Sequence, residues 1–252
     1  APLVMLSSAY RIDHMLDLDG NGRMDLASIS QSASQFNFLV SLNDGSGAFP
    51  SATGAGRGAD YPKISHMETC DGNMDGVDDL LVVVRSGPGS SVVAGFMQVL
   101  AWRDGAPYLI DHLEYDGISQ TVALATVLDA DRDGDADRVR VMRVFPSNVE
   151  LALDLFEQDA GGAWHFTTQT MPLVAVPQAI LRFDYDGDGY TDLWLHDSGT
   201  SRVLPLAGGV LNPLVAVPHG ITSDMPMAIL GDVDGDADQD LAIFDMDGYV
   251  IQ

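Results

Sequence analysis

The sequence predicts an all-β fold of the β-propeller class with five four-stranded blades. Three observations lead to this prediction: an acidic motif recurs five times, short apolar segments flank the copies, and no stretch carries an apolar stripe of helical period and length. The copies begin roughly 50 residues apart, a period that suits a propeller blade and exceeds that of helical-hairpin repeats. We expect residues 1–252 to form one domain, because all-β folds of this length often remain undivided.

The acidic motif separates the first two expected strands of each repeat. Its copies are DLDGNGRMD from Asp17, DGNMDGVDD from Asp71, DADRDGDAD from Asp129, DYDGDGYTD from Asp184 and DVDGDADQD from Asp232. Apolar segments precede them, as in residues 180–183, and short aliphatic segments follow most of them, as in residues 80–84 and 241–244. Apolar runs of this length, bounded by turn residues, are typical of strands.

The segments between the motifs are expected to form hairpins. They span residues 36–49, 96–110 and 149–166, and their Gly and Asp residues supply the positive φ angles of tight turns. The sequence GAGRG, Gly54–Gly58, lacks the spacing of a phosphate-binding loop and is expected to form a loop after a strand.

A second repeat marks the end of each blade. The sequence PLVAVP of Pro172–Pro177 recurs as Pro213–Pro218, and Pro2–Val4 stands in the comparable place before the first motif. The fifth repeat stops before this segment, so we expect residues Ala1–Leu6 to supply its last strand and close the ring, which removes an exposed sheet edge. The alternative is that the chain is a fragment of a larger propeller.

Each motif carries oxygen-bearing side chains at positions 1, 3, 5 and 9, counted from its first Asp. These side chains are Asp17, Asp19, Asn21 and Asp25; Asp71, Asn73, Asp75 and Asp79; Asp129, Asp131, Asp133 and Asp137; Asp184, Asp186, Asp188 and Asp192; and Asp232, Asp234, Asp236 and Asp240. A backbone carbonyl at position 7 is expected to add one more oxygen, from Arg23, Val77, Asp135, Tyr190 and Asp238.

This donor set favours calcium, with up to five ions per chain. Alternate positions of a tightly turned loop direct their oxygens to one centre, and Ca²⁺ takes about six to eight such ligands. Mg²⁺ demands stricter octahedral geometry, and no His or Cys stands at a ligand position for a transition metal. Plain solvated turns are the alternative, but carboxylates at this spacing repel one another without a cation.

The chain resembles the FG-GAP/VCBS repeat family, whose calcium-binding blades also occur in the integrin α-subunit headpiece. Residues Asp184–Leu193 match DxDxDGxxDL almost fully, and NDGSGAF from Asn43 is similar to the Gly-rich hairpin of the family. The resemblance implies a β-propeller with Ca²⁺ between the first two strands of each blade, in extracellular proteins of adhesion or recognition. The chain departs from the pattern at Ala237, in place of Gly, and at Arg138, in place of Leu.

The composition limits the binding partners and the cellular location that we expect for the protein. The 37 acidic residues against 12 basic ones give a formal net charge of −25, which repels nucleic-acid backbones and anionic membranes. The single cysteine, Cys70, excludes an internal disulfide and is expected to be a small buried residue. We expect no nucleic-acid partner, no membrane insertion, and a secreted or cell-surface location in which packing and metal provide the stability.

We do not expect an enzyme, because the G-x-S-x-G, H-E-x-x-H and phosphate-loop motifs are absent from the sequence. The six histidines lie far apart in the sequence and are expected to be structural, and Trp102 or Trp164 could stack on a sugar. The predicted function is an extracellular recognition or adhesion module for a protein or glycan partner. The alternatives are a structural spacer or accessory domain of a larger secreted protein, and a calcium-dependent polysaccharide-active enzyme.

Overall fold

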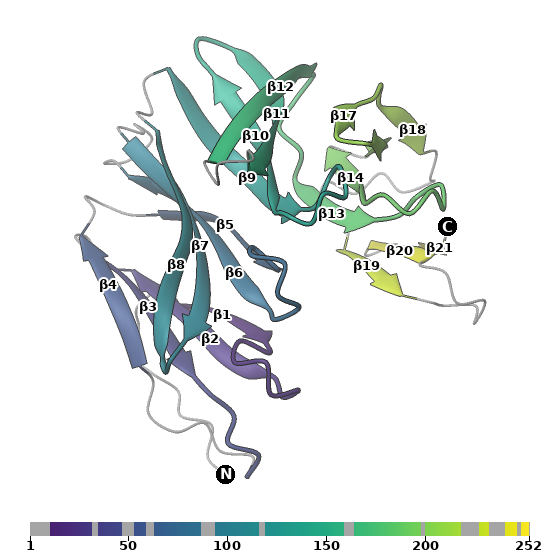
Figure 1. Ribbon diagram of the computed structural model, residues 1–252. Coiled ribbons are helices and arrows are strands. Elements are labelled where there is room, and N and C mark those ends of the chain that lie inside the picture. The colour runs from purple at the N-terminus through teal and green to yellow at the C-terminus, as the bar shows by residue number, and fades with distance from the viewer. Residues whose placement is uncertain are drawn as a thin grey trace. The chain divides into compact units, whose positions relative to one another are not determined.

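The protein is all-β, as predicted. The computed structural model describes residues 11–31, 35–46, 53–58, 63–86, 94–115, 119–158, 164–197, 200–217, 227–231, 240–245 and 248–251. Within these ranges every regular element is a β-strand (Figure 1). The described residues contain no helix long and apolar enough to cross a membrane.

The strands form successive sheets, each made of neighbouring parts of the chain. The first sheet joins β1 (Arg11–Leu16), β2 (Asp25–Gln31), β3 (Gln35–Ser41) and β4 (Thr53–Gly58) in that order. The second joins β5 (Lys63–Cys70), β6 (Asp79–Ser86), β7 (Ala94–Arg103) and β8 (Ala106–Tyr115), and the third joins β9 (Gln120–Leu128), β10 (Asp137–Val144), β11 (Asn148–Gln158) and β12 (Trp164–Leu173).

The fourth sheet carries an insertion that the sequence did not suggest. It joins β13 (Ala179–Phe183), β14 (Asp192–Asp197), β15 (Thr200–Leu204) and β18 (Val215–Val217), with a separate pair of strands, β16 (Leu206–Ala207) and β17 (Val210–Leu211), between its last two members. The fifth sheet has three described strands, β19 (Met227–Gly231), β20 (Asp240–Asp245) and β21 (Gly248–Ile251).

A four-stranded sheet wound in chain order is the blade of a β-propeller. Four such blades are present, whereas the fifth repeat contributes three described strands, so the predicted count of five complete blades is not established. The segments expected to end the third and fourth blades are strands only in part: Pro172 and Leu173 end β12 while residues 174–177 belong to no strand, and Val215–Val217 is β18 while Pro213 and Leu214 precede it outside a strand. Residues 1–6, predicted to close the ring, lie outside the described residues.

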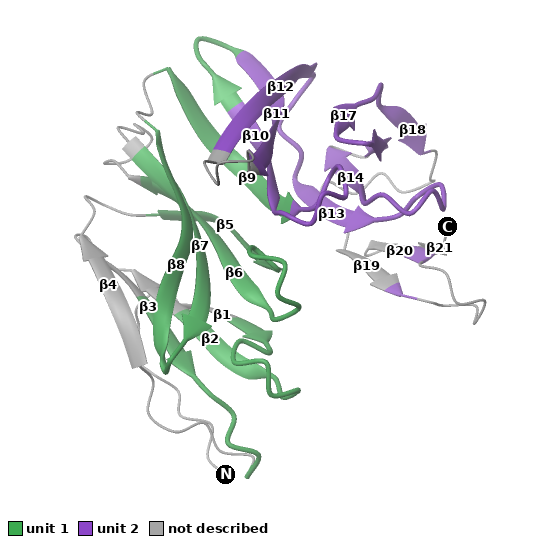
Figure 2. Cartoon of the chain, viewed as in Figure 1, with its two compact units in different colours: residues 1–127, 143–147 green, residues 128–142, 148–252 purple. Residues whose placement is uncertain are grey.

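The chain divides into two compact units (Figure 2). Unit 1 comprises residues 1–127 and 143–147, and unit 2 comprises residues 128–142 and 148–252. In unit 1 the first two sheets share a core that includes Leu16, Phe38 and Val40 from one sheet and Leu80 and Val82 from the other. In this core the sheets pack face to face, as neighbouring blades do.

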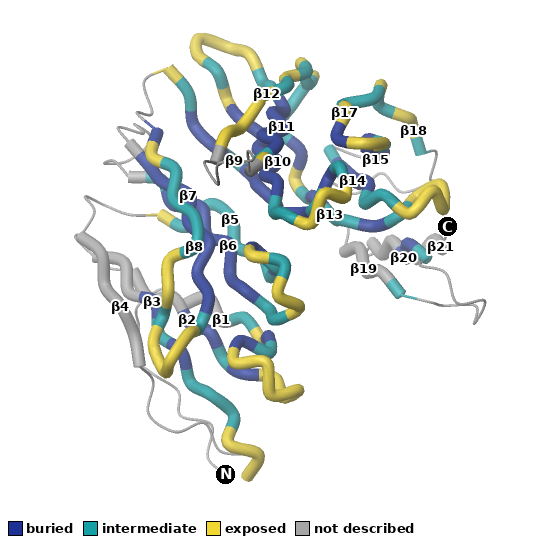
Figure 3. The backbone as a smooth tube through the Cα atoms, viewed as in Figure 1, coloured by how far each residue is buried: buried dark blue, intermediate teal, exposed yellow. Residues whose placement is uncertain are grey.

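Burial follows this packing. All five residues of Leu80–Val84 are fully buried (Figure 3), and Leu80, Val82 and Val84 pack in the core shared with the first sheet. In unit 2, Phe183, Trp194 and Val203 of the fourth sheet pack against Leu241 of β20, so two sheets again share one core.

The third sheet contains a buried ionic cluster. Arg138 and Arg140 donate from Nε to Oδ2 of Asp154 at 3.0 Å and 2.7 Å, and Thr168 donates to Oδ1 at 2.7 Å. Burial opposes the ionisation of Asp154, but Arg140, Thr168 and Arg138 together hold its pKa below its usual value. Leu stands at the position of Arg138 in the other four repeats. The buried positive charge that Arg138 introduces there is neutralised by Asp154.

Two of the expected hairpins are confirmed. Strands β7 and β8 meet at Asp104 and Gly105, whose φ angles of 53° and 79° suit a two-residue turn, and β11 pairs with β12 from Val149↔Leu173 to Gln158↔Trp164. The prediction for residues 36–49 is wrong in its return strand. Strand β3 pairs with Thr53–Gly58, so GAGRG is an edge strand rather than a loop, because pairing on one side needs only its main chain.

Candidate metal sites

The acidic motifs form loops between the first two strands of their sheets. The first connects β1 to β2, the second β5 to β6, the third β9 to β10 and the fourth β13 to β14. The fifth connects β19 to β20, but its residues 232–239, including Asp232, Asp234, Asp236 and Asp238, lie outside the described residues. The placement agrees with the one that the family resemblance implied.

The Asp at position 9 is the buried anchor of each described loop. Asp25, Asp79, Asp137 and Asp192 are at most 2% exposed. One carboxylate oxygen accepts a hydrogen bond from the backbone N–H at position 2, at distances of 3.0 Å for Leu18 to Asp25, 2.8 Å for Gly72 to Asp79, 2.8 Å for Ala130 to Asp137 and 2.8 Å for Tyr185 to Asp192. This bond closes the loop on the start of the second strand.

The other oxygen of the anchor ties the loop to the rest of its sheet. Oδ1 of Asp25 accepts from the backbone N–H of Asn43, that of Asp137 from Phe156, and that of Asp192 from Leu206, each at 2.8 Å. Sequence reasoning missed these donors, because they lie in or just after later strands and come close only when the sheet forms.

The remaining ligand positions are held by the loop's own amides. The N–H at position 6 donates to the Asp at position 1, at 2.6 Å for Gly22 to Asp17 and 2.8 Å for Gly189 to Asp184. The N–H at position 5 donates to the side-chain oxygen at position 3, as in Asp188 to Asp186 at 3.2 Å. These bonds turn the side chains of positions 1 and 3 into the concave side of the loop.

The loops bend through two left-handed residues. At position 6 the φ angles are 80°, 82°, 91° and 87° for Gly22, Gly76, Gly134 and Gly189. At position 4 the φ angles are also positive, and two of these residues are not glycine: Met74 at 55° and Arg132 at 65°. The requirement at position 4 was not foreseen, because Met and Arg rarely adopt this conformation.

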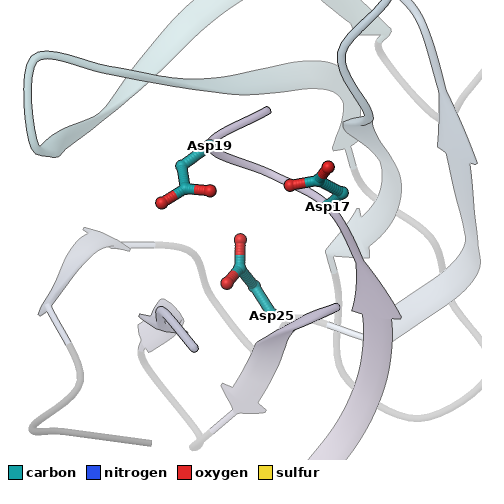
Figure 4. A group of neighbouring side chains, drawn as sticks. All are labelled: Asp17, Asp19 and Asp25. Atoms are coloured by element: carbon teal, nitrogen blue, oxygen red, sulfur yellow. The ribbon is translucent and has the colours of Figure 1, made fainter. Parts of the chain in front are cut away.

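Carboxylate oxygens converge in three of the four described loops. Oxygens of positions 1, 3 and 9 lie within 4.8 Å of one another in the groups Asp17, Asp19 and Asp25 (Figure 4), Asp129, Asp131 and Asp137, and Asp184, Asp186 and Asp192. The second loop has the same backbone bonds around Asp71, Asn73, Asp75 and Asp79, with an amide oxygen at position 3. Each of the three carboxylate groups could hold a metal ion.

The electrostatics of the loops also fit a cation. Burial raises the pKa of Asp79 to about 7 and that of Asp137 to about 6, and nearby carboxylates add to both shifts. In the third loop, burial and the charges of Asp133 and Asp137 raise the pKa of Asp135 to about 7. A divalent ion would remove the repulsion that disfavours the ionised forms.

Two buried oxygens of the third loop have no hydrogen-bond partner. They are Oδ1 of Asp129, at position 1, and Oδ1 of Asp135, at position 7. Asp135 was predicted to contribute its backbone carbonyl, and the structure adds its side chain as a candidate donor. Orphaned carboxylate oxygens beside a cluster of acceptors are what a hard cation would satisfy, so the residues fit Ca²⁺.

The other residues considered from sequence lie mostly in structural positions. Cys70 and Trp194 are buried, and Trp102 packs against the core of unit 1. His66 lies 3.2 Å from the carboxylate of Glu68, which also accepts a hydrogen bond from Thr126. The side chain of Trp164 lies outside the part that the structure describes.

Comparison with known proteins supports the repeat assignment. Residues 17–82 match the model of the FG-GAP-like repeat, which confirms the resemblance over the first loop, the second loop and the strands between them. No curated protein matches the chain.

Solved structures that are similar at a low level include two of the same complex. The crystal structure of BBS1N in complex with ARL6DN, soaked with mercury, is 14% identical with a TM-score of 0.41 and covers 96% of this chain and 78% of that chain. The same complex soaked with lead is 12% identical with a TM-score of 0.31 and covers 98% and 92%. These likenesses are too weak to assign a fold, a partner or a function.

Proposed function

We propose that the protein is a calcium-stabilised, propeller-type recognition module of the extracellular space. The observation that carries the proposal is the repetition of one oxygen-rich loop, with the same anchor bond from position 2 to position 9, in all four described repeats. A solvated turn has no need for a buried carboxylate in every copy. The all-oxygen donor set favours Ca²⁺ over transition metals.

The side chains at positions 1, 3, 5 and 9 would hold the ion, together with the carbonyl at position 7. A bound Ca²⁺ would supply the positive charge that offsets the repulsion between the carboxylates at the start and the end of each loop. The chain's own contribution is to orient the oxygens, through the bonds from Gly22 to Asp17 and from Asn43 to Asp25 in the first repeat. Bound ions would therefore act mainly on the stability of the blades.

The partner is proposed to be a protein rather than a glycan. Trp194 is fully buried and Trp102 packs partly buried against the core of unit 1, while the side chain of Trp164 lies outside the described residues. Several large apolar side chains are exposed instead, among them Phe166 at 57% and Tyr185 at 45%. The spacer role stays as the second candidate, and an enzyme is not proposed.

Five blades and ring closure by residues Ala1–Leu6 also belong to the proposal. The fifth repeat has the motif and three described strands, and a sheet edge left open there would be prone to pair with other chains. Deletion of residues 1–6 should cause aggregation or a steep loss of thermal stability in saturating Ca²⁺. A truncated protein that stays monomeric with an unchanged Tm would contradict closure.

Metal content tests the proposed function. Protein dialysed against Ca²⁺, Mg²⁺ and Zn²⁺ together should retain calcium by elemental analysis, with a stoichiometry of several ions per chain. A protein with the exposed position-5 side chain of each described loop changed to Ala should retain less. Retention of zinc, or of no metal at all, would overturn the proposal.

A further inference from the structure

The third and fourth loops of unit 2 contact each other through Arg132. This residue occupies position 4 of the third loop, between the candidate ligands Asp131 and Asp133. Its Nη2 donates a hydrogen bond to the backbone carbonyl of Gly189, and its guanidinium carbon lies 4.5 Å from the ring centroid of Tyr190. Gly189 and Tyr190 are positions 6 and 7 of the fourth loop.

The first and second loops of unit 1 meet at the same positions. Gly20, at position 4 of the first loop, lies so close to Val77, at position 7 of the second, that a Cβ on the glycine would stand 2.9 Å from Cγ2. Asp17 also donates from its backbone N–H to Oδ2 of Asp78 at 2.8 Å. Position 4 of one loop thus meets position 7 of the next in both units, and in unit 2 an arginine makes the contact.

We propose that Arg132 couples the third and fourth loops, so that a cation bound in one raises the affinity of the other. The inference rests on the proposed calcium binding. A cation in the third loop would order Asp131 and Asp133, and with them the backbone from which Arg132 reaches the fourth loop. The guanidinium then holds the segment whose next carbonyl, that of Tyr190, is the position-7 donor.

The coupling comes from shared ordering. When the first ion has already ordered the contact, the second ion meets a smaller entropic penalty, and linkage makes the effect reciprocal. The charge of Arg132 acts separately, because a cation near both loops lowers the affinity of each for a metal ion. An Arg132→Lys variant keeps the charge but loses the planar group that stacks on Tyr190 and the fork of donors.

Terbium luminescence can report the fourth site. Among the five motifs only the fourth contains aromatic residues, Tyr185 and Tyr190, so tyrosine-sensitised emission of Tb³⁺ comes mainly from an ion bound there. Tyr190 also lies against Arg132 of the third loop, so an Asp188→Ala variant, which weakens the fourth site, measures the emission that the third site contributes. Asp133→Ala weakens the third site at an exposed side chain, and Asp131→Ala is the second choice if the first variant does not fold. Terbium is titrated into the full chain, these variants, Arg132→Lys and the double variants, with Arg143→Lys as a matched exposed control.

Loss of the third site should change the Tb³⁺ affinity of the fourth site by different amounts with and without Arg132. Loss of the third site should weaken Tb³⁺ binding at the fourth by about fivefold when Arg132 is present, the lower end for coupled sites, and by less than about twofold in the Arg132→Lys background. The Arg143→Lys control should behave as the unmodified chain. Asp133→Ala removes one negative charge in both backgrounds, so the electrostatic effect of this loss on the fourth site cancels in the comparison.

Three results would overturn the coupling. Affinity at the fourth site could be indifferent to the third site, or the loss could be equal with and without Arg132, and either result leaves calcium binding intact. An absence of sensitised emission in every protein would instead remove the proposed metal binding itself, and the coupling with it.

Discussion

Replacement of Asp192 by Ala should destabilise the protein even without metal, whereas replacement of Asp188 should not. Asp192 is 1% exposed and accepts backbone hydrogen bonds from Tyr185 and Leu206, each at 2.8 Å. Asp188 is exposed and accepts from Tyr190 at 2.8 Å on the loop surface. Both are candidate ligands of the fourth site, so a comparison of the two variants separates the anchoring role of position 9 from metal binding.

The magnitude follows from the burial of the two donors. Loss of a buried acceptor costs about 1–3 kcal/mol per unpaired donor, and the Leu206 N–H is buried while the Tyr185 N–H is only partly so. Asp192→Ala should therefore lower the free energy of unfolding in EDTA by about 2–4 kcal/mol. Asp188→Ala should change it by about 0.5 kcal/mol or less, as surface substitutions do.

Denaturant unfolding in EDTA and in excess Ca²⁺ provides the assay. In Ca²⁺ at about 100 times the Kd of the site, both variants should lose a further ~2.7 kcal/mol relative to the unmodified chain. Equal destabilisation of the two variants in EDTA would refute the anchoring role of position 9. Equal stability of the unmodified chain and Asp188→Ala in Ca²⁺ would refute ligation by position 5.

Three further predictions concern other parts of the molecule. The pKa of Asp79 is raised from 3.8 in the unfolded chain to about 7 in the folded protein, and that of Asp137 to about 6. In EDTA the folded protein therefore binds these protons more tightly, and the free energy of unfolding should fall as the pH rises from about 4 to 7. A flat pH profile would contradict this. Asp154→Asn should cost about 3–5 kcal/mol in denaturant unfolding, while an apolar replacement of Arg138, Arg140 and Asp154 together should be near neutral. Ala237→Gly should tighten the fifth site, expected to be the weakest, as measured by calcium titration, and an unchanged affinity would show that position 6 is not left-handed there.

The sequence predicts the acidic loops and the convergence of their carboxylates because the spacing of these residues is local. Alternate oxygens at positions 1, 3, 5 and 9 and the strands on either side are set within one loop, so the convergence of Asp17, Asp19 and Asp25 could be anticipated. The same holds for the aliphatic run Leu80–Val84, which predicts a strand and lies in β6.

Features that depend on distant parts of the chain were not predictable. The N–H of Asn43 reaches Asp25 from the end of β3 only when β2 and β3 pair in the sheet. Arg132 of the third loop reaches Gly189 of the fourth, 57 residues further along the chain. Strand β4 was missed because GAGRG has no side-chain pattern, and its pairing with β3 rests on main-chain bonds. The left-handed conformation of Met74 and Arg132 overrides residue preference, since the loop must bend there to bring its oxygens together.

Anomalous diffraction from crystals grown in calcium tests the central claim most directly. The account predicts anomalous peaks in the four described loops, each about 2.3–2.6 Å from the side-chain oxygens at positions 1, 3, 5 and 9 and from the carbonyl at position 7. Loops that keep their hydrogen bonds without an anomalous peak at saturating Ca²⁺ would contradict the claim that these carboxylates form metal sites.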